Sequence, residues 1–214
     1  MPVPLVPVKA LAEAKGRLAP TVGPLQRRLL AIAMFEDVIA ALQAVPGLAA
    51  PVVVSPDREV WRRADAMGCR VVEEPPGAGD LNRSLASAAA GLGDGSLLVV
   101  AADLPLASAA GLERVLAAAE APVAVVPSHD GGGTNVLAWR DPASFAPSFG
   151  PDSAARHLAV PGAVRVDEPG LALDVDTAAD LELVASRLDP SSVTARRLKD
   201  LAMLPPVTGS TEEA

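Results

Sequence analysis

Two aspartates one residue apart, Asp174 and Asp176, end an apolar run in the segment GLALDVDTAADLELV (170–184). In an extended chain side chains repeat every second residue, so both carboxylates would point to one face. Like charges held that close resist ionisation unless a positive charge lies between them, and a divalent cation can supply it. The pair therefore predicts a metal site. One alternative stays open: Asp176 or Thr177 can instead be the N-cap of the helix that follows.

A third acidic residue, Asp103, follows the apolar run SLLVVAA (96–102). An ionised carboxylate is costly to bury at such a position unless it is paired or binds a metal, although an aspartate after a strand can also cap the next helix. Asp103, Asp174 and Asp176 together offer the hard oxygen ligands that Mg²⁺ requires and leave positions for water and substrate phosphates. We therefore expect Mg²⁺ as the cofactor.

Positive charge gathers near the N-terminus, in the stretch VPVKALAEAKGRLAP (6–20). The chain has three lysines, and two of them, Lys9 and Lys15, lie here together with Arg17. A loop that presents cations at the end of a strand suits a triphosphate, whose departing pyrophosphate it can neutralise. The alternative is an ordinary solvated turn.

Two glycine-containing segments, SHDGGGTNVLAW (128–139) and SFGPDSAARH (148–157), are the next candidates. Three consecutive glycines let the main chain approach a ligand and expose backbone N–H groups. Gly150 and Ser153 precede a helix whose N-terminus can hold an anion, unless the segment is only a flexible turn with a serine N-cap. His157 on that helix is expected to be packed and hydrogen-bonded rather than catalytic.

Short apolar runs alternate with helical segments along the chain, which predicts an α/β sandwich whose sheet is buried on both faces. In such sheets ligands bind at the carboxyl ends of the strands, where the polar residues above are found. We expect strands at 3–8, 51–55, 69–74, 96–102, 122–127, 134–139 and 171–176. Helices are expected within 23–45, 58–68, 81–92, 108–120, 152–160, 178–188 and 191–204.

Size and composition favour one globular domain (1–204) followed by a disordered tail (205–214). The net charge of −8, the 2% of aromatic residues and the absence of tyrosine disfavour nucleic-acid binding. No apolar stretch approaches the ~18–20 residues of a membrane span, and the N-terminus lacks the pattern of a signal peptide. A single cysteine, Cys69, excludes an internal disulfide. These features predict a cytoplasmic protein.

Several motifs of known chemistry are missing from the sequence. There is no G-x-G-x-x-G after the first strand and no G-x-x-x-x-G-K-[ST], which disfavours dinucleotide binding of the Rossmann type and a P-loop. Neither G-x-S-x-G nor H-E-x-x-H occurs, and the two histidines share no metal-ligand spacing.

Six motifs in order resemble the CofC/FbiD family, the guanylyltransferases of coenzyme F420 biosynthesis, over roughly residues 3 to 190. They are the N-terminal VPVKALAEAKGRLAP, DLN (80–82), AADLP (101–105), GGTN (132–135), FGPDSAARH (149–157) and LDVDTAADL (173–181). The resemblance implies a three-layer nucleotidyltransferase fold, glycosyltransferase-A-like, with a mixed, mostly parallel sheet. It also implies transfer of GMP from GTP to phosphoenolpyruvate or 2-phospho-L-lactate.

The resemblance assigns roles to named residues. The Mg²⁺ ligands would be Asp103, Asp174 and Asp176; the phosphoenolpyruvate carboxylate and phosphate would be bound by Thr134, Gly150 and Ser153; the nucleotide would face Lys9, Lys15, Arg17 and Asn82. A homodimer and handover of the product to the next transferase are left open. So are two rival functions, a sugar-nucleotide enzyme of the same fold and a non-catalytic GTP-binding domain.

Overall fold

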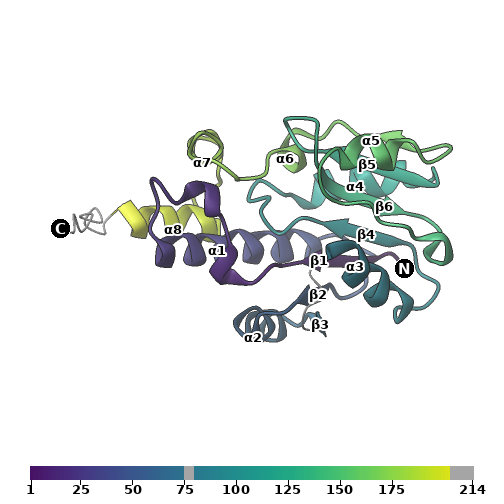
Figure 1. The fold of residues 1–214 in the computed structure, drawn as a ribbon, viewed down its shortest axis with the longest axis horizontal. Coiled ribbons are helices and arrows are strands. Elements are labelled where there is room, and N and C mark those ends of the chain that lie inside the picture. The colour runs from purple at the N-terminus through teal and green to yellow at the C-terminus, as the bar shows by residue number, and fades with distance from the viewer. Residues whose placement is uncertain (75–79, 203–214) are drawn as a thin grey trace, which may run out of the picture.

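The structure is a computed structural model that describes residues 1–74 and 80–202, and its strands form one seven-stranded sheet (Figure 1). The strands are β1 (Val3–Pro7), β2 (Val52–Ser55), β3 (Arg70–Glu73), β4 (Leu97–Val100), β5 (Val123–Pro127), β6 (Thr134–Trp139) and β7 (Val164–Arg165). Their order in the sheet is β3–β2–β1–β4–β6–β5–β7. Among the described strands β6 runs against its neighbours β4 and β5, and the other pairs are parallel. The expected mixed, mostly parallel sheet is confirmed.

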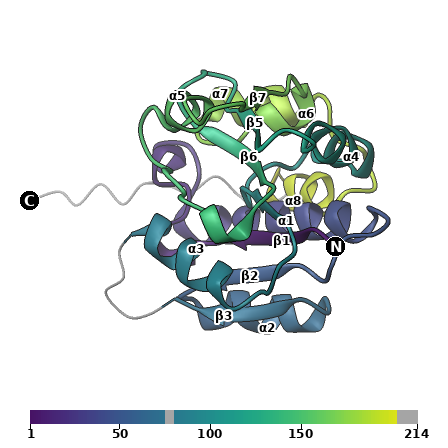
Figure 2. The same cartoon turned by 90° about the vertical axis from the view of Figure 1, so that its right-hand side faces the viewer.

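Helices cover both faces of this sheet (Figure 2). They are α1 (Pro24–Gln43), α2 (Arg58–Ala66), α3 (Leu81–Ala90), α4 (Ala109–Ala118), α5 (Ser153–Leu158), α6 (Pro169–Ala172), α7 (Ala178–Ala185) and α8 (Val193–Ala202). The short helix α6 and the edge strand β7 were not expected from the sequence. The expected tail at 205–214 lies outside the described residues. No helix of the described part of the chain combines the length and apolar character of a membrane span.

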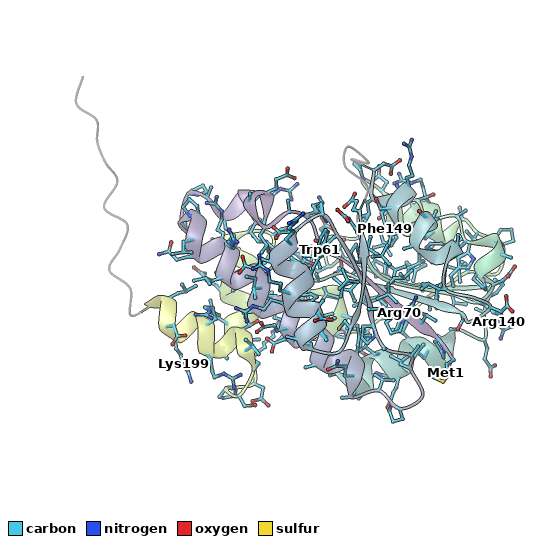
Figure 3. All side chains as sticks on the ribbon, turned by 90° about the horizontal axis from the view of Figure 1, so that it is seen from below. Met1, Trp61, Arg70, Arg140, Phe149 and Lys199 are labelled. Carbon is cyan, nitrogen blue, oxygen red and sulfur yellow. The ribbon has the colours of Figure 1, made fainter. Side chains whose placement is uncertain are left out.

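Successive residues of the strands point into two separate cores, as the period of an extended chain requires. Leu5 of β1 packs with α3, whereas its neighbour Val6 packs with α1, α2 and α4 on the opposite face. Both side chains are fully buried. Figure 3 shows how densely side chains fill these layers, while Arg140 and Lys199 lie at opposite ends of the molecule. The sheet is therefore a rigid base for the loops at its edges.

The carboxyl ends of β1 and β4 lie side by side in the middle of the sheet. After β1 the chain passes to β2 on one side, whereas β4 is the neighbour of β1 on the other side, so the strand order reverses between them. Loops that leave such a point in opposite directions open a crevice, and ligands of open α/β sheets bind there. Lys9 follows β1 and Asp103 follows β4 at this position.

The expected strand at 171–176 is wrong. Leu171 and Ala172 belong to α6, which begins at Pro169. Leu173 is extended, and residues 173–176 join no strand of the sheet. Their burial nevertheless alternates, because Leu173 and Val175 are buried while Asp174 and Asp176 are partly exposed. Extended backbone gives this two-residue period whether or not a neighbouring strand pairs with it.

Leu173 and Val175 pack into a third, smaller core between α1 and α7. Leu18 of the loop after β1, Leu30 and Met34 of α1 and Val184 of α7 complete this cluster, and each is fully buried. Burying such side chains is worth ~1.5–3 kcal/mol each. Leu173 and Val175 thus anchor the segment to the helices. Asp174 and Asp176, which alternate with them, lie beside Asp103 at the carboxyl end of β4.

Candidate active site

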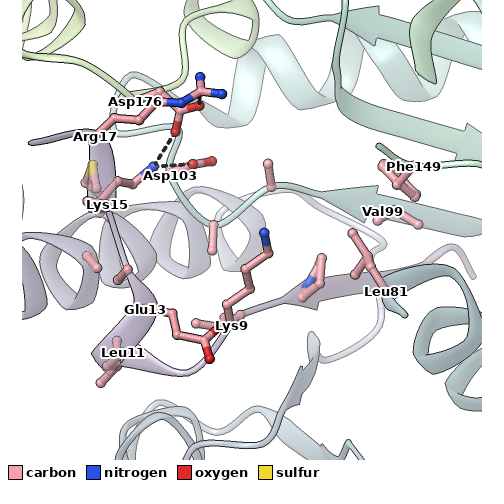
Figure 4. A pocket seen from close by; sticks show the side chains of 18 of the residues that line it. Lys9, Leu11, Glu13, Lys15, Arg17, Leu81, Val99, Asp103, Phe149 and Asp176 are labelled. Atoms are coloured by element: carbon pink, nitrogen blue, oxygen red, sulfur yellow. Dashed lines mark hydrogen bonds and ion pairs between the residues drawn. The ribbon is translucent and has the colours of Figure 1, made fainter. Parts of the chain in front are cut away.

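A cavity of about 560 Å³ opens at the carboxyl ends of β1 and β4 (Figure 4). Lys15, Asp103 and Asp176 line one end of it, while Leu81 and Phe149 line the other. A volume of several hundred Å³ is typical of small-molecule sites. The cavity therefore has a charged end and a more apolar end.

Three carboxylates meet at the charged end. One oxygen each of Asp103, Asp174 and Asp176 lies within 4.8 Å of the others, although 71 residues separate the first two in the chain. The amide of Val175, between the two later aspartates, donates to the carbonyl oxygen of Asp103 (3.3 Å). This bond fixes the D-x-D segment beside the end of β4, so the predicted convergence of the three side chains is present in the structure.

Asp174 is contacted by two residues that were not expected at the site. The Asn135 side chain donates to the Asp174 carboxylate (3.1 Å) and to the carbonyl oxygens of Leu171 and Ala172 (3.1 and 2.8 Å). His129 lies 3.6 Å from the same carboxylate. The signal in the sequence was a second polar residue, Asn135, next to Thr134 at the start of a strand whose other four residues are apolar.

Burial raises the pKa of Asp174 above its usual value, and the charges of Asp103 and Asp176 raise it further. The Asn135 hydrogen bond acts in the opposite direction, because it stabilises the ionised form. A carboxylate whose ionised form is disfavoured by burial and by two like charges is one that a bound cation would stabilise.

Asp176 and Asp103 are not helix caps. Thr177 is the N-cap of α7, and its hydroxyl accepts from the Asp180 amide while the Asp180 carboxylate accepts from the Thr177 amide. Ser108 caps α4, the helix after Asp103. The capping alternatives for both aspartates are therefore wrong, and their carboxylates are available for other contacts.

Lys15 extends into the acidic cluster from an unusual backbone conformation. It has φ 55 and ψ 41, in the left-handed region that non-glycine residues rarely adopt, and its side chain is only 8% exposed. Its ammonium group pairs with Asp103 and lies 3.3 Å from Asp176. Burial alone would lower the pKa of Lys15, but the charges and hydrogen bonds of the two carboxylates outweigh it, so the pKa lies above its usual value.

The donor set fits a small hard cation. In an octahedral Mg²⁺ site with oxygens about 2.1 Å from the ion, adjacent oxygens are about 3.0 Å apart and opposite ones about 4.2 Å apart. The three carboxylate oxygens lie within 4.8 Å of one another, so they are near enough to be drawn onto one ion. Carboxylates are also the ligand type that Mg²⁺ prefers.

The other expected nucleotide-binding cations lie at the same cavity. Lys9 is exposed and points into the open space between the two ends (Figure 4). Arg17 is 77% exposed and lies 3.4 Å from Asp176. The loop after β1 thus presents three cations to one cavity, as its sequence predicted.

The residues expected to bind phosphoenolpyruvate, the acceptor substrate, lie around the start of β6 and the start of α5. Thr134 lines the cavity, and its hydroxyl is 2.9 Å from the Nδ1 atom of His157. The Ala154 amide donates to the Gly132 carbonyl (3.4 Å), so the two glycine-containing segments are in contact. Gly150 has φ 121, and Ser153 is 1% exposed.

Two expectations for these segments are corrected. Ser153 is the first residue of α5 rather than its cap, because the N-cap position is taken by Asp152. The three glycine amides are not exposed for a ligand. Gly131 donates to the carbonyl of Ser128, Gly132 to the carboxylate of Asp130 and Gly133 to the hydroxyl of Ser128, at 2.8, 3.0 and 2.7 Å. The loop uses its own amides to set its shape.

Asn82 was expected to face the nucleotide. Its side chain instead contacts the segment of Phe149 and Gly150, where the acceptor substrate was expected to bind. Its side-chain nitrogen donates to the Phe149 carbonyl (3.1 Å), and its side-chain oxygen accepts from the Phe149 amide (2.6 Å). These two bonds tie the start of α3 to the segment that carries Gly150. His157, as expected, is packed and hydrogen-bonded.

Solved structures with the same architecture are nucleotidyltransferases. A nucleotidyl transferase from Methanothermobacter thermautotrophicus matches with a TM-score of 0.61 and 18% identity, covering 86% of this chain and 96% of that one. A cytidylyltransferase from Leptospira borgpetersenii matches at 0.56 and 14%, covering 94% of both chains. A protein of Desulfovibrio desulfuricans G20 reaches 0.73 at 17% identity over 94% and 96% of the two chains; its name, nucleotide-diphospho-sugar transferase, is provisional. The fold is that of this class.

Sequence comparison is more specific. Residues 3–187 match the family described as "Guanylyl transferase CofC like", and the chain belongs to this family. A phosphoenolpyruvate guanylyltransferase of Nocardia farcinica is 45% identical over 206 residues, 92% of this chain and 90% of that protein. A protein of the same name from Sphaerobacter thermophilus is 38% identical over 194 residues, 86% and 92% of the two chains. The resemblance found from six short motifs is confirmed.

Proposed function

We propose that this chain transfers the guanylyl group of GTP to phosphoenolpyruvate and releases pyrophosphate, as a step in coenzyme F420 biosynthesis. The family and the names of its relatives support this reaction. The single observation that carries it is that Lys15, Asp103, Asp176 and Thr134 line one cavity, while Asp174 lies beside the two aspartates and completes an acid triad (Asp103, Asp174 and Asp176).

The central difficulty of this reaction is that both substrates are polyanions. Lys9, Lys15 and Arg17 come from one loop and are placed to neutralise the triphosphate and then the leaving pyrophosphate. The acid triad is the proposed Mg²⁺ site, and a bound Mg²⁺ would polarise phosphoryl oxygens and draw negative charge from the transition state.

The acceptor side has a different task, which is to hold a small phospho-acid in line with the α-phosphorus. Thr134 lines the cavity, and we assign its hydroxyl, together with Gly150 and Ser153, to this anion on the basis of their motifs. Positioning of this kind can account for much of a phosphoryl-transfer rate, because the chemistry needs little more than alignment and charge stabilisation.

The proposed step needs no general base. A phosphate oxygen of phosphoenolpyruvate forms a new bond to the α-phosphorus of GTP, and the bond between that phosphorus and the α–β bridging oxygen breaks. The bridging oxygen leaves with the pyrophosphate. A phosphate monoester has a second pKa of about 6, so the attacking oxygen is already ionised at neutral pH. A chain whose one fully buried histidine is held neutral suits such a mechanism.

Three further parts of the proposal concern the setting of the enzyme. We expect it to act in the cytoplasm, where GTP is available. The product joins two phosphates in a reactive anhydride, so direct handover to the next transferase would protect it from hydrolysis. A homodimer remains a proposal that sedimentation would test.

Pyrophosphate release from GTP and Mg²⁺ tests the function, with phosphoenolpyruvate, 2-phospho-L-lactate and 3-phosphoglycerate supplied in parallel. We expect phosphoenolpyruvate to give the highest kcat/KM. Faster turnover of 2-phospho-L-lactate would change the acceptor and leave the reaction class intact. Uptake of a nucleotide sugar without pyrophosphate release would favour a sugar-nucleotide enzyme. GTP binding without turnover of any acceptor would favour a non-catalytic domain.

A further inference from the structure

His157 lies next to Thr134 of the cavity lining, and both of its ring nitrogens make hydrogen bonds. The residue is 1% exposed. Its Nδ1 atom lies 2.9 Å from the Thr134 hydroxyl oxygen, and its Nε2 atom accepts a hydrogen bond of 2.9 Å from the Ser148 amide. The ring also packs edge-on against Phe149, with ring centroids 5.0 Å apart. This histidine therefore contacts both segments that form the acceptor side.

The Ser148 contact determines where the imidazole proton is. A backbone N–H can only donate, so the Nε2 atom that faces it must carry a lone pair rather than a proton. Burial, together with the charge of Arg156, lowers the pKa of His157 to about 4, so the ring is neutral at physiological pH. A neutral imidazole holds one proton, which must then be on Nδ1.

The position of this proton also orients the Thr134 hydroxyl. The Nδ1–H group donates to the hydroxyl oxygen, so the proton of that hydroxyl cannot point back at the ring. Thr134 lines the cavity. Because its O–H proton is not used by the ring, the hydroxyl can donate it to another acceptor, and an anion in the cavity would be such an acceptor.

We propose that His157 is a positioning residue for the acceptor substrate: its Nδ1–H group turns the Thr134 hydroxyl into a fixed hydrogen-bond donor toward the phospho-acid. The order of donation is Ser148 amide to Nε2, Nδ1–H to Thr134, and Thr134 to the substrate anion. This inference rests on the proposed function for the identity of that anion.

A simpler role would be to hold the loop alone. Both backbone groups of Ser148 are hydrogen-bonded to α5. Arg156 donates to the Ser148 carbonyl oxygen from Nε and Nη2 (3.2 and 2.8 Å), and His157 accepts from the Ser148 amide. If loop anchoring were the whole role of His157, then only the Nε2 contact would matter for acceptor binding. The two nitrogens must therefore be tested separately.

Two conservative variants separate them. In His157→Asn the amide nitrogen takes the place of Nδ1 and can still donate to Thr134, but the contact with the Ser148 amide is lost. In His157→Gln the amide oxygen takes the place of Nε2 and can still accept from Ser148, but the donor to Thr134 is lost. Thr134→Val removes the hydroxyl itself, with Thr134→Ser as the matched control.

Steady-state kinetics with varied phosphoenolpyruvate at saturating GTP gives the first readout. We expect His157→Gln and Thr134→Val each to raise KM for phosphoenolpyruvate roughly tenfold or more, the size of a lost hydrogen bond to a charged group. His157→Asn and Thr134→Ser should stay within about threefold of the wild type, and KM for GTP should be unchanged in all four. His157→Gln without effect, or His157→Asn as the worse variant, would overturn the proposal.

The double variant His157→Gln/Thr134→Val tests whether His157 acts through Thr134. If it does, the second change adds nothing to KM for phosphoenolpyruvate once the hydroxyl is gone. Multiplied effects would mean that His157 influences the acceptor by another route and would overturn the relay.

Imidazole ¹⁵N NMR at neutral pH gives a readout that needs no substrate. The chain has two histidines, so loss of one signal set in His157→Gln assigns His157. We expect a protonated Nδ1 and an unprotonated Nε2, and the opposite tautomer overturns the proposal. Absence of turnover by the wild type would instead refute the proposed function, while the tautomer would still report the hydrogen-bond chain on its own.

Discussion

The ammonium group of Lys15 pairs with the Asp103 carboxylate across 88 residues of sequence, from a backbone in the left-handed region. Such a conformation costs a non-glycine residue on the order of 1 kcal/mol or more. The cost is offset by the ion pairs that the buried ammonium group makes with Asp103 and Asp176. Lys15 thus supplies positive charge both to the acid triad and to the charged end of the cavity.

Replacing Lys15 by Met should separate these two roles. The triad then keeps three negative charges without the buried ammonium group, so its affinity for Mn²⁺ or Mg²⁺ should increase severalfold. Turnover should nevertheless fall by about two orders of magnitude, because the triphosphate loses a cation worth several kcal/mol in the transition state. Mn²⁺ binding followed by electron paramagnetic resonance, together with pyrophosphate release, measures both effects.

Arg17→Met is the matched control, because it removes the same charge from an exposed side chain that lies 3.4 Å from Asp176. Its effect on metal affinity should be smaller, since water screens exposed pairs. Weaker metal binding in Lys15→Met than in the wild type would mean that Lys15 mainly assembles the triad rather than opposing the charge of an ion.

The acid triad predicts a loss of activity without a loss of fold. Asp103→Asn and Asp176→Asn keep the size and polarity of each side chain but remove a charge that the proposed metal needs. Turnover should drop by about two orders of magnitude or more in each variant. The free energy of unfolding should change by no more than about 1 kcal/mol for Asp176→Asn, because its carboxylate is 45% exposed and its ion pairs are accordingly weak.

Asp200→Asn is the control, because it makes the same chemical change at an exposed residue of α8. It should leave turnover and the free energy of unfolding unaltered. Isothermal calorimetry with Mg²⁺ gives the direct measurement of metal binding. Unaltered metal affinity and turnover in both triad variants would remove the assignment of these aspartates.

Asn82 should influence the acceptor more than the nucleotide. Its side chain makes two hydrogen bonds to the Phe149 peptide, in the segment that leads to Gly150. Asn82→Ala should therefore raise KM for phosphoenolpyruvate more than KM for GTP, and should destabilise the protein by roughly 1–3 kcal/mol. Kinetics with each substrate varied in turn, and chemical denaturation, measure the two effects. A larger change in KM for GTP would restore the role expected from the sequence.

The fold and the position of the acid triad could be predicted from the sequence because both follow from local patterns of apolar and polar residues. Local apolar runs determine the strands, and parallel strands bring their carboxyl ends to one edge of the sheet. Asp103 and Lys9 were therefore placed correctly from their position after a strand. The two-residue period at 173–176 also gave the right face for Asp174 and Asp176.

The features that could not be predicted from the sequence depend on contacts between residues that are distant in the chain. The segment at 171–176 was expected to be a strand, but α6 occupies its first two residues and no strand pairs with the rest. The contacts of Asn135 with Asp174, and of Asn82 with Phe149, span 39 and 67 residues. No local pattern specifies which backbone group a buried amide side chain will meet.

The buried, neutral His157 makes a final prediction, on stability against pH. An unfolded histidine takes up a proton below about pH 6.5, whereas His157 in the folded chain has a pKa of about 4. Between these values the unfolded state binds more protons, so stability must fall as the pH falls from 6.5 to 4. The physical cause is that burial of the ring, together with the charge of Arg156, disfavours its protonated form. A protonated Nε2 would also face the Ser148 amide, donor against donor.

The difference in unfolding free energy between the wild type and His157→Gln isolates this contribution, because other titrating groups are common to both proteins. The wild type should lose up to about 3 kcal/mol relative to the variant between pH 6.5 and pH 4, with no further change above or below that window. Urea denaturation at closely spaced pH values gives the curve. A difference that stays constant from pH 7 to pH 4 would mean that the folded histidine titrates normally and that its Nε2 atom is not committed to the Ser148 amide.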